Sequence, residues 1–231
     1  PIIDLLAVVT LFRVTRTLGG FPMTEVLLMY GLAATGFCLA DLAVGNIEKI
    51  RVYVREGLLD AVLIRPLGVL GQLVTLDFAL RRIARLLVAL AVLGFAVHRA
   101  GLDWTAGRIV LLGLTPIGGA VLFGSIFVAG STVAFWWIES GEIANGFTYG
   151  GRDFTSYPIT VYSRVFRRIF AYGVGFAFVG YYPALALLGR ADPLGTPGWL
   201  RWCAPAVCLM AVPVAGVVWR FGVRHYRSTG S

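Results

Sequence analysis

Charged side chains are scarce in this sequence. Only 14% of its residues are charged, whereas 58% are hydrophobic, and the mean hydropathy is +0.81. A typical soluble domain carries about 25% charged residues and is less apolar. The composition therefore excludes an ordinary soluble domain and predicts an all-α integral membrane protein with several spans.

The groups that enzymes use for chemistry are also few. Lysine occurs once, at Lys49, and no phosphate-loop glycine pattern precedes it, so we expect any ATP hydrolysis to come from a partner. His98 and His225 are the two histidines, and they form no His-Glu-x-x-His zinc motif. A Gly-x-Ser-x-Gly elbow is missing as well. We expect no catalytic residue, metal site or cofactor in this chain.

Cysteine is rare and glycine is abundant. The three cysteines, Cys38, Cys203 and Cys208, lie in or beside apolar segments, where they are expected to act as small hydrophobes. Glycines cluster in residues 109–138, which contain Gly113, Gly118, Gly119, Gly124 and Gly130. Small residues let helices approach each other closely, so we expect close packing there and a kink near Pro116.

Long apolar segments dominate the chain. Residues 109–138, 169–189 and 202–219 contain no charged side chain, and each reaches or nearly reaches the roughly 20 residues that cross a bilayer. The full prediction is a single membrane domain with six spans, at about residues 1–13, 24–45, 83–102, 109–138, 169–189 and 200–221. The first span is expected to be partial, with its beginning outside this sequence, and no signal peptide is visible.

The basic residues follow a pattern of membrane sidedness. A net charge of +8 can indicate nucleic acid, but most Lys and Arg residues fall in the segments between spans. We predict a cytoplasmic loop at 46–82, a second at 139–168 and a cytoplasmic tail at 222–231, which satisfies the positive-inside rule. Both termini are then cytoplasmic, and the chain contacts membrane lipid and no nucleic acid.

A short amphipathic helix is predicted within residues 54–67. Its apolar residues recur at helical spacing, its charged residues mark a polar side, and Pro66 ends it. The apolar positions are Val54, Leu58, Leu59, Val62 and Leu63, and the charged ones are Arg55, Glu56 and Asp60. Two interpretations remain open: the helix lies on the lipid surface, or it grips a partner.

Acidic residues near the predicted span ends also carry alternatives. Glu139 and Glu142 are three apart and can share a helix face, or they simply mark where the fourth span leaves the membrane. Asp41 lies near the end of the second span. Intramembrane acids are functional candidates by default, but for Asp41 we favour a structural or partner-pairing role.

Several segments together resemble a known family. They are residues 54–67, residues 135–162 with the Tyr149-Gly-Gly stretch and Tyr157-Pro158, residues 181–190 and the tail 219–230. These residues resemble the ABC-2 type permeases, in the branch of uncharacterised bacterial exporter permeases, over nearly the whole chain. The start departs from the family pattern, because the amphipathic elbow helix and the beginning of the first span are not in this sequence.

The resemblance implies a six-span ABC-2 bundle of the type V-like exporter kind, in which residues 54–67 form a coupling helix. Such a helix docks in a cleft of a cytoplasmic ATPase subunit. The charged residues would pair with the ATPase, Gly57 would allow close approach, and the leucines and Val62 would supply the buried contact. The implied coupling residues are Arg55, Glu56, Gly57, Leu58, Leu59, Asp60, Val62, Leu63, Arg65 and Pro66.

The resemblance also implies partners. Two ABC ATPase subunits would hold ATP and Mg, and a second permease chain, either a copy or a relative, would complete an exporter of the bacterial plasma membrane that works by alternating access. A second cytoplasmic contact would involve Glu139, Glu142, Arg152 and Asp153, unless that segment is only anchored at lipid headgroups. Tyr181, Tyr182 and Pro183 would form an outer gate, unless they belong to the aromatic belt.

Two other functions are alternatives to a permease. A lipid-modifying membrane enzyme needs clustered acids or histidines at one depth, and Arg152 with Asp153 is the nearest approach. An ion-coupled transporter or channel needs charged residues in mid-span, and the predicted cores are almost bare of them. The substrate does not follow from the sequence, although an apolar or amphipathic one suits the predicted lining.

Overall fold

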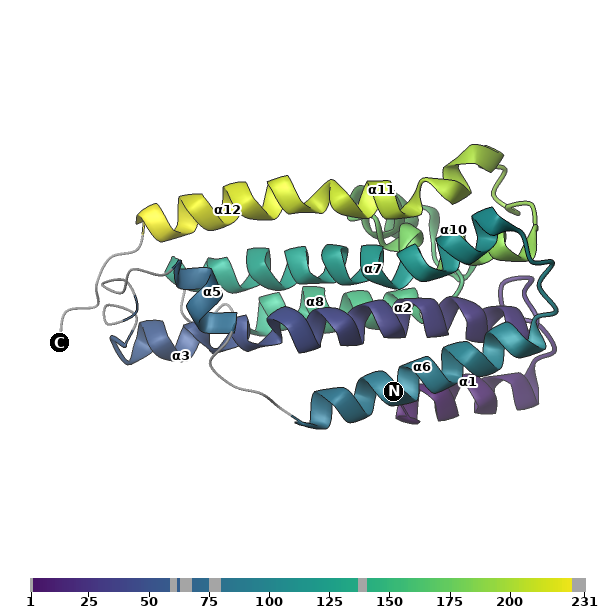
Figure 1. Ribbon diagram of the computed structural model, residues 1–231, viewed down its shortest axis with the longest axis horizontal. Coiled ribbons are helices and arrows are strands. Elements are labelled where there is room, and N and C mark those ends of the chain that lie inside the picture. The colour runs from purple at the N-terminus through teal and green to yellow at the C-terminus, as the bar shows by residue number, and fades with distance from the viewer. Residues whose placement is uncertain (1, 59–61, 63–67, 75–79, 137–140, 226–231) are drawn as a thin grey trace.

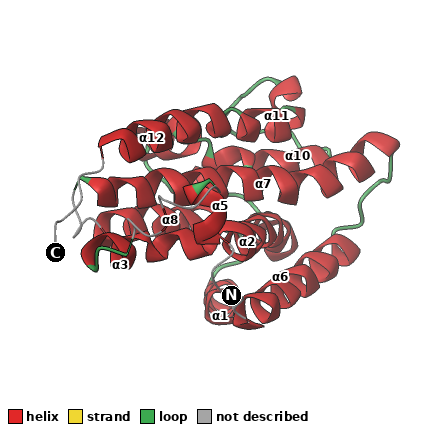
Figure 2. Ribbon diagram, turned by 60° about the vertical axis from the view of Figure 1, so that its left-hand side comes forward, coloured by secondary structure: helices red, strands yellow, loops and turns green. Residues whose placement is uncertain are grey.

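The computed structural model describes residues 2–58, 62, 68–74, 80–136 and 141–225, and all the elements in this part of the chain are helical (Figure 2). The longer elements are α1 (Ile2–Val14), α2 (Met23–Val44), α6 (Leu80–Arg99), α7 (Ala106–Thr132), α8 (Gly141–Thr155), α10 (Tyr181–Leu188) and α12 (Ala211–His225). The shorter elements are η1 (Gly45–Lys49), α3 (Ile50–Arg55), α5 (Val69–Val74), η2 (Val133–Phe135), η4 (Ile159–Val161), α9 (Arg164–Phe166), η5 (Arg167–Gly173), η6 (Phe176–Phe178), η7 (Gly198–Trp202) and α11 (Ala204–Leu209).

The long helices lie side by side and define two ends of an elongated bundle (Figure 1). One end carries α3, α5 and the end of α12, and we call it the α3 end. The other carries α10 and the turns that join α1 to α2 and α6 to α7, and we call it the α10 end. Helices α1, α2, α6 and α7 lie within a few residues of the segments 1–13, 24–45, 83–102 and 109–138, and of these four helices α2 and α7 are long and apolar enough to cross a membrane.

Helix α2 lies at the centre of the bundle. It packs against α7 on one side and α6 on the other, and 83% of its most apolar stretch is buried inside the protein. A helix that is apolar all round is expected to be buried in this way. Gly36 of α2 faces Gly119 of α7 so closely that an added Cβ on Gly36 would lie 3.0 Å from the Gly119 Cα. The close packing predicted from the glycines of α7 is therefore confirmed at Gly119.

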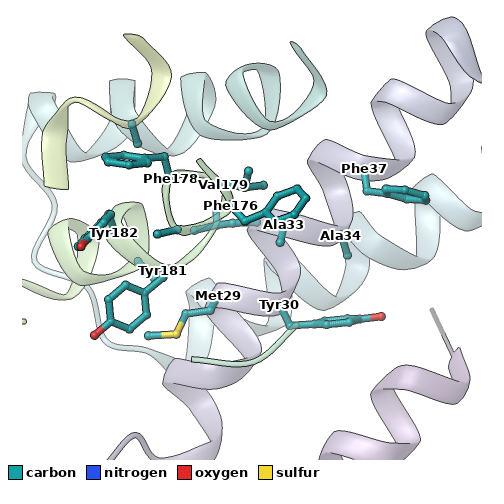
Figure 3. Packing of buried hydrophobic residues seen from close by; sticks show 14 of the residues in the cluster. Met29, Tyr30, Ala33, Ala34, Phe37, Phe176, Phe178, Val179, Tyr181 and Tyr182 are labelled. Atoms are coloured by element: carbon teal, nitrogen blue, oxygen red, sulfur yellow. The ribbon is translucent and has the colours of Figure 1, made fainter. Parts of the chain in front are cut away.

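The core surrounds the middle of α2. Phe37 of α2 meets Phe123 of α7 edge to face, with ring centroids 5.2 Å apart, and Phe123 meets Phe176 of η6. Figure 3 shows Met29 and Ala33 of α2 on the side of this helix that faces η6 and the tyrosines that begin α10. Offset and edge-on aromatic pairs of this kind add stability beyond their buried area.

Three described helices are long and apolar enough to cross a membrane: Met23–Arg55, Ala106–Phe135 and Ala204–His225. A fourth is reached if Arg164–Gly173 and Phe176–Leu188 count as one span, although these two segments are bent by 67°. The six-span prediction is therefore not confirmed as a count. The span expected at 169–189 is not one straight helix, because a π-helical turn and Gly175 at φ +93° interrupt it.

The predicted loop 139–168 also differs from the structure. From Gly141 the chain turns back as α8 and packs beside α7 and α2, with Tyr149 against Phe37 and Phe127. The segment then continues to the α10 end, where the Thr160 hydroxyl donates a hydrogen bond to the Gly19 carbonyl. The glycines and scattered polar residues of α8 give it an average hydropathy below that of a span, so a loop was the natural expectation.

Candidate coupling site

The tip of the α3 end is a short exposed turn. In α3, Ile50 and Val54 are buried, whereas Val52 and Arg55 are exposed. The helix stops at Arg55 because Gly57 adopts φ +67°, a left-handed conformation that ends helices and that favours glycine. The predicted helix 54–67 is therefore interrupted at Gly57, and most of its later residues lie outside the described part of the chain. Arg55 and Glu56 are exposed, and Leu58 keeps 46% of its surface exposed.

A second hydrophobic cluster fixes this turn to the bundle. Its buried members are Ile50, Val54, Val62, Leu73, Ala134 and Phe135, and Trp219 and Val223 of α12 pack against it. Val62 is only 6% exposed, so its side chain is used within the chain and does not supply the docking contact that the sequence predicted. Leu58 remains available for that role. Leu59, Asp60, Leu63, Arg65 and Pro66 lie outside the described residues.

Side-chain amides tie the two ends of the loop together. The Asn46 amide donates to the Val74 carbonyl at 2.9 Å, and its oxygen accepts from Arg82 at 2.7 Å. The Gln72 amide donates to the Val62 carbonyl at 3.1 Å. Buried amides that find partners in this way rigidify a segment. The described parts of this loop, η1, Val62 and α5, are thus joined to one another, and η1 is joined to the start of α6.

Asp41 is paired, as the structural interpretation of the sequence predicted. It is 3% exposed and lies at the end of α2, where Arg85 of α6 approaches to 2.6 Å and Arg82 to 3.2 Å. Two guanidinium groups on one carboxylate satisfy a buried charge that would otherwise be costly. The pairing locks α2 to α6 one turn before the loop begins.

Helix α8 reaches this region from the opposite side. The Tyr149 hydroxyl donates to Glu48 of η1 at 3.4 Å, and Arg152 forms an ion pair with Asp4 of α1 at 2.7 Å. Arg152 also lies over the Phe37 ring, 5.5 Å from its centroid. These contacts connect η1 to α8 and, through Arg152, α8 to α1.

The residues predicted for a second partner contact differ in how exposed they are. Arg152 points into the bundle and is engaged there, so it is not available to a partner. Asp153 has a side chain that is 66% exposed and lies 3.3 Å from Arg152. Glu142 lies in the first turn of α8, and Glu139 is outside the described residues.

The predicted gate residues lie at the α10 end and are buried. Tyr181 is 3% exposed, Tyr182 is fully buried and Pro183 is buried as well. The Tyr181 hydroxyl donates to Asp192 at 2.7 Å, and its ring meets Phe21 edge to face. These residues are packed inside the α10 end. Their opening in a transport cycle stays a prediction.

Sequence reasoning missed a second set of contacts at the α10 end. Arg190 forms an ion pair with Glu25, donates to the Gly20 carbonyl and covers the Phe21 ring at 4.3 Å. A basic residue directly after an apolar segment was the available signal, because such residues often return to the preceding turn. The α10 end is thus held by charge pairs as the α3 end is.

These features define a multi-pass helical membrane protein. Its charged turn, Arg55–Leu58, follows a helix that packs against the ends of longer helices. Within the described residues no group of three or more His, Cys, Asp or Glu is placed to hold a metal ion. The family model of the ABC-2 family transporter proteins matches residues 1–230, and the chain belongs to this family. It is therefore a membrane permease component of an ABC transporter, of a kind that generally acts without enzymatic activity beside ABC ATPase partners. No curated protein and no solved structure matches the chain.

Proposed function

We propose that the chain is the permease subunit of an ATP-driven exporter in a bacterial plasma membrane, with both termini in the cytoplasm. Two ABC ATPase subunits would bind ATP and Mg, and a second permease chain would complete the pathway. The observation that supports this proposal is the exposed turn Arg55–Leu58, which combines two opposite charges with an apolar side chain at the tip of the α3 end.

The coupling mechanism uses the turn as the end of a lever. ATP-driven closure of the ATPase pair pushes on Arg55, Glu56 and Leu58, and Gly57 lets the partner approach the backbone. The second hydrophobic cluster and Asn46 keep the loop rigid, so the push reaches the helices instead of bending the loop. From there it passes along Asp41 to α6 and along Glu48 to α8.

Transport then follows from the relative motion of the helices. α8 and α1 move as a pair because Arg152 joins them, whereas α2 and α6 move as a pair because Asp41 joins them. Rocking of one pair of helices against the other opens a path first to the cytoplasmic side of the membrane and then to the outer side. Export, rather than import, is part of the proposal.

The test compares two exposed apolar residues at opposite ends of the bundle. The permease is co-purified with its cognate ABC ATPase, and ATP hydrolysis is measured in lipid for the native chain, Leu58→Asp and Val161→Asp. Leu58 is 46% exposed and Val161 is 49% exposed, so both changes add a charge at a comparable surface position. We expect Leu58→Asp to lose ATPase association and Val161→Asp to keep it.

Two results would overturn the proposal. If Leu58→Asp and Val161→Asp retain the ATPase equally well, the turn is not the docking point. If the native chain moves substrate in liposomes without any ATPase, energy coupling is of another kind, as in the ion-coupled alternative.

A further inference from the structure

The broken segment α9–η5 carries three arginines on one side. Arg164 and Arg168 are four residues apart and Arg164 and Arg167 are three apart, spacings that place side chains together on a helix. Arg164 and Arg168 are exposed and Arg167 is half-buried. Within the described part of the chain, none of the three makes a salt bridge or a side-chain hydrogen bond. Between Asp153 and Asp192 the sequence contains no acidic residue.

The other side of the segment faces α8. The Phe166 ring lies 5.4 Å from that of Phe154, and the Phe170 ring lies 6.3 Å from it and 6.4 Å from that of Phe147. These aromatic contacts hold α9–η5 against α8. Because Phe166 and Phe170 face α8, Arg164 and Arg168, each two residues away from one of them, face away from it, and the half-buried Arg167 lies at the side.

The segment reaches deep into the bundle. Phe170 lies between the levels of Phe147 and Phe154 on α8, and Tyr149, between these two, contacts Phe37 of α2. Phe37 is about 21 Å along α2 from Met23, at 1.5 Å per residue. A hydrocarbon core is about 30 Å thick, so with α2 crossing the bilayer from Met23 we infer that Arg167 and Arg168 lie inside the core and not at its edge.

Exposed arginines and irregular backbone at this depth exclude a lipid-facing surface. Charged side chains within a membrane almost always face a protein interior or a water-filled cavity. The π-helical turn Arg167–Gly173 and the bend after it are tolerated only where they are covered by protein or line such a cavity. Broken helices of this kind mark binding sites in other transporters.

A tight contact with a second copy does not suit this face either. A two-fold axis that passed through this face would set the same arginines of both copies against each other, and like charges at an interface are repulsive. Water or an anion between the two copies would relieve this repulsion. Rings of arginine serve as anion and phosphate selectors in pores for the same reason.

We propose that Arg164, Arg167 and Arg168 line the transport pathway and bind the anionic group of an amphipathic substrate, such as a phosphate or sulfate ester. The inference deepens the proposed permease function and rests on it. Guanidinium groups bind such oxyanions through paired hydrogen bonds. The apolar part of the substrate would move along the aromatic and aliphatic side chains that flank the arginines, among them Val165 and Ile169, which are 67% and 54% exposed.

The test measures binding to the full chain in neutral phosphatidylcholine nanodiscs. Octyl phosphate is the probe, octyltrimethylammonium is the cationic comparison, and empty nanodiscs give the background for titration calorimetry. We expect the native chain to bind octyl phosphate and to discriminate against the cation. The triple variant R164Q/R167Q/R168Q should lose about tenfold in affinity for each arginine that contacts the anion.

A second triple variant controls for net charge. R81Q/R220Q/R224Q removes three exposed arginines from α6 and α12, outside the proposed site, and should bind octyl phosphate as the native chain does. R164K/R167K/R168K keeps the charge and should recover part of the affinity. If the two glutamine triples bind alike, the effect is one of net charge and the site is refuted. If R164Q/R167Q/R168Q instead changes the number of permease copies per particle, the face is a contact between copies and the proposal fails.

The result is separable from that of the proposed function. Binding of octyl phosphate requires no ATPase, whereas the Leu58→Asp experiment requires no substrate. If octyl phosphate binding depends on the arginines but the chain never binds an ATPase, the exporter proposal is contradicted and the anion site is supported. If R164Q/R167Q/R168Q binds the ATPase and also binds octyl phosphate as the native chain does, the exporter proposal is supported and the anion site is refuted.

Discussion

Arg152 of α8 lies 2.7 Å from the carboxylate of Asp4 in α1, although 148 residues separate them in the sequence. This ion pair connects the first helix to a segment that the hydropathy pattern assigned to a loop. It is therefore a contact that holds the fold together and, in the proposed mechanism, a contact that transmits movement.

Replacing Asp4 by asparagine is expected to destabilise the fold. The two side chains are 21% and 26% exposed, so the loss should be about 1–3 kcal/mol, as for a hydrogen bond to a charged group. Thermal unfolding of the full chain in a neutral detergent measures it. Asp153→Asn is the control, because Asp153 lies 3.3 Å from the same arginine with a side chain that is 66% exposed, and it should change little. Equal shifts for both variants would contradict a specific role for Asp4.

Replacing Asp41 by asparagine is expected to destabilise the fold more than the change at Asp4. Asp41→Asn leaves Arg82 and Arg85 without their carboxylate at a site that is 3% exposed, and breaking a buried pair costs about 3–5 kcal/mol. Asp103→Asn is the matched control, since Asp103 has a side chain that is 97% exposed and its ion pair with Arg108 is 3.8 Å long. Proteolysis of the detergent-solubilised chain should increase for the first variant and not for the second.

Two adjacent glycines of α8 offer a sharp comparison. A Cβ on Gly151 would lie 2.2 Å from the Phe176 ring, whereas a Cβ on Gly150 meets nothing within 4 Å. Gly151→Ala should therefore cost about 1–3 kcal/mol by overpacking. Gly150→Ala should be neutral or stabilising by up to about 1 kcal/mol, because alanine favours a helix. Unfolding temperatures of both variants check the position of α8, and the reverse order would show that α8 is packed differently.

Replacing Gly57 by alanine is expected to weaken the proposed function with little effect on the rest of the fold. Alanine at φ +67° costs about 1–2 kcal/mol, so the turn Arg55–Leu58 should change shape. Affinity for the ATPase, measured by biolayer interferometry, should fall by about fivefold or more. Gly20→Ala imposes a comparable strain, at φ +90°, at the α10 end and should leave that affinity unchanged. Loss of affinity in both variants would mean that the change is global.

Much of the bundle follows from the sequence alone. The apolar runs located α2, α7 and the helices near the C-terminus, because burial of a span depends on composition and length. The glycines of α7 predicted a close approach, and Asp41 predicted a pairing, because an acid in an apolar environment needs a partner. The family resemblance was also confirmed, over residues 1–230.

The site was predicted only in part. Arg55 at the end of α3 and Glu56 and Leu58 in the turn after it are exposed, and their docking role stays a prediction. Val62 was misassigned because an apolar residue at helical spacing looks the same whether it faces a partner or its own chain. Its neighbours Ala134 and Phe135 are far away in the sequence.

Composition and hydropathy by themselves determined that this protein is a helical membrane protein and which segments are apolar enough to be buried. Only the tertiary structure decided that 141–155 returns into the bundle, that 164–188 is bent, and which charges meet. The physical reason is that a span is a local property of about 20 consecutive residues. The partners of Arg152 and Asp41, and the face presented by Arg164, depend on contacts between helices distant in sequence, and no local pattern records them.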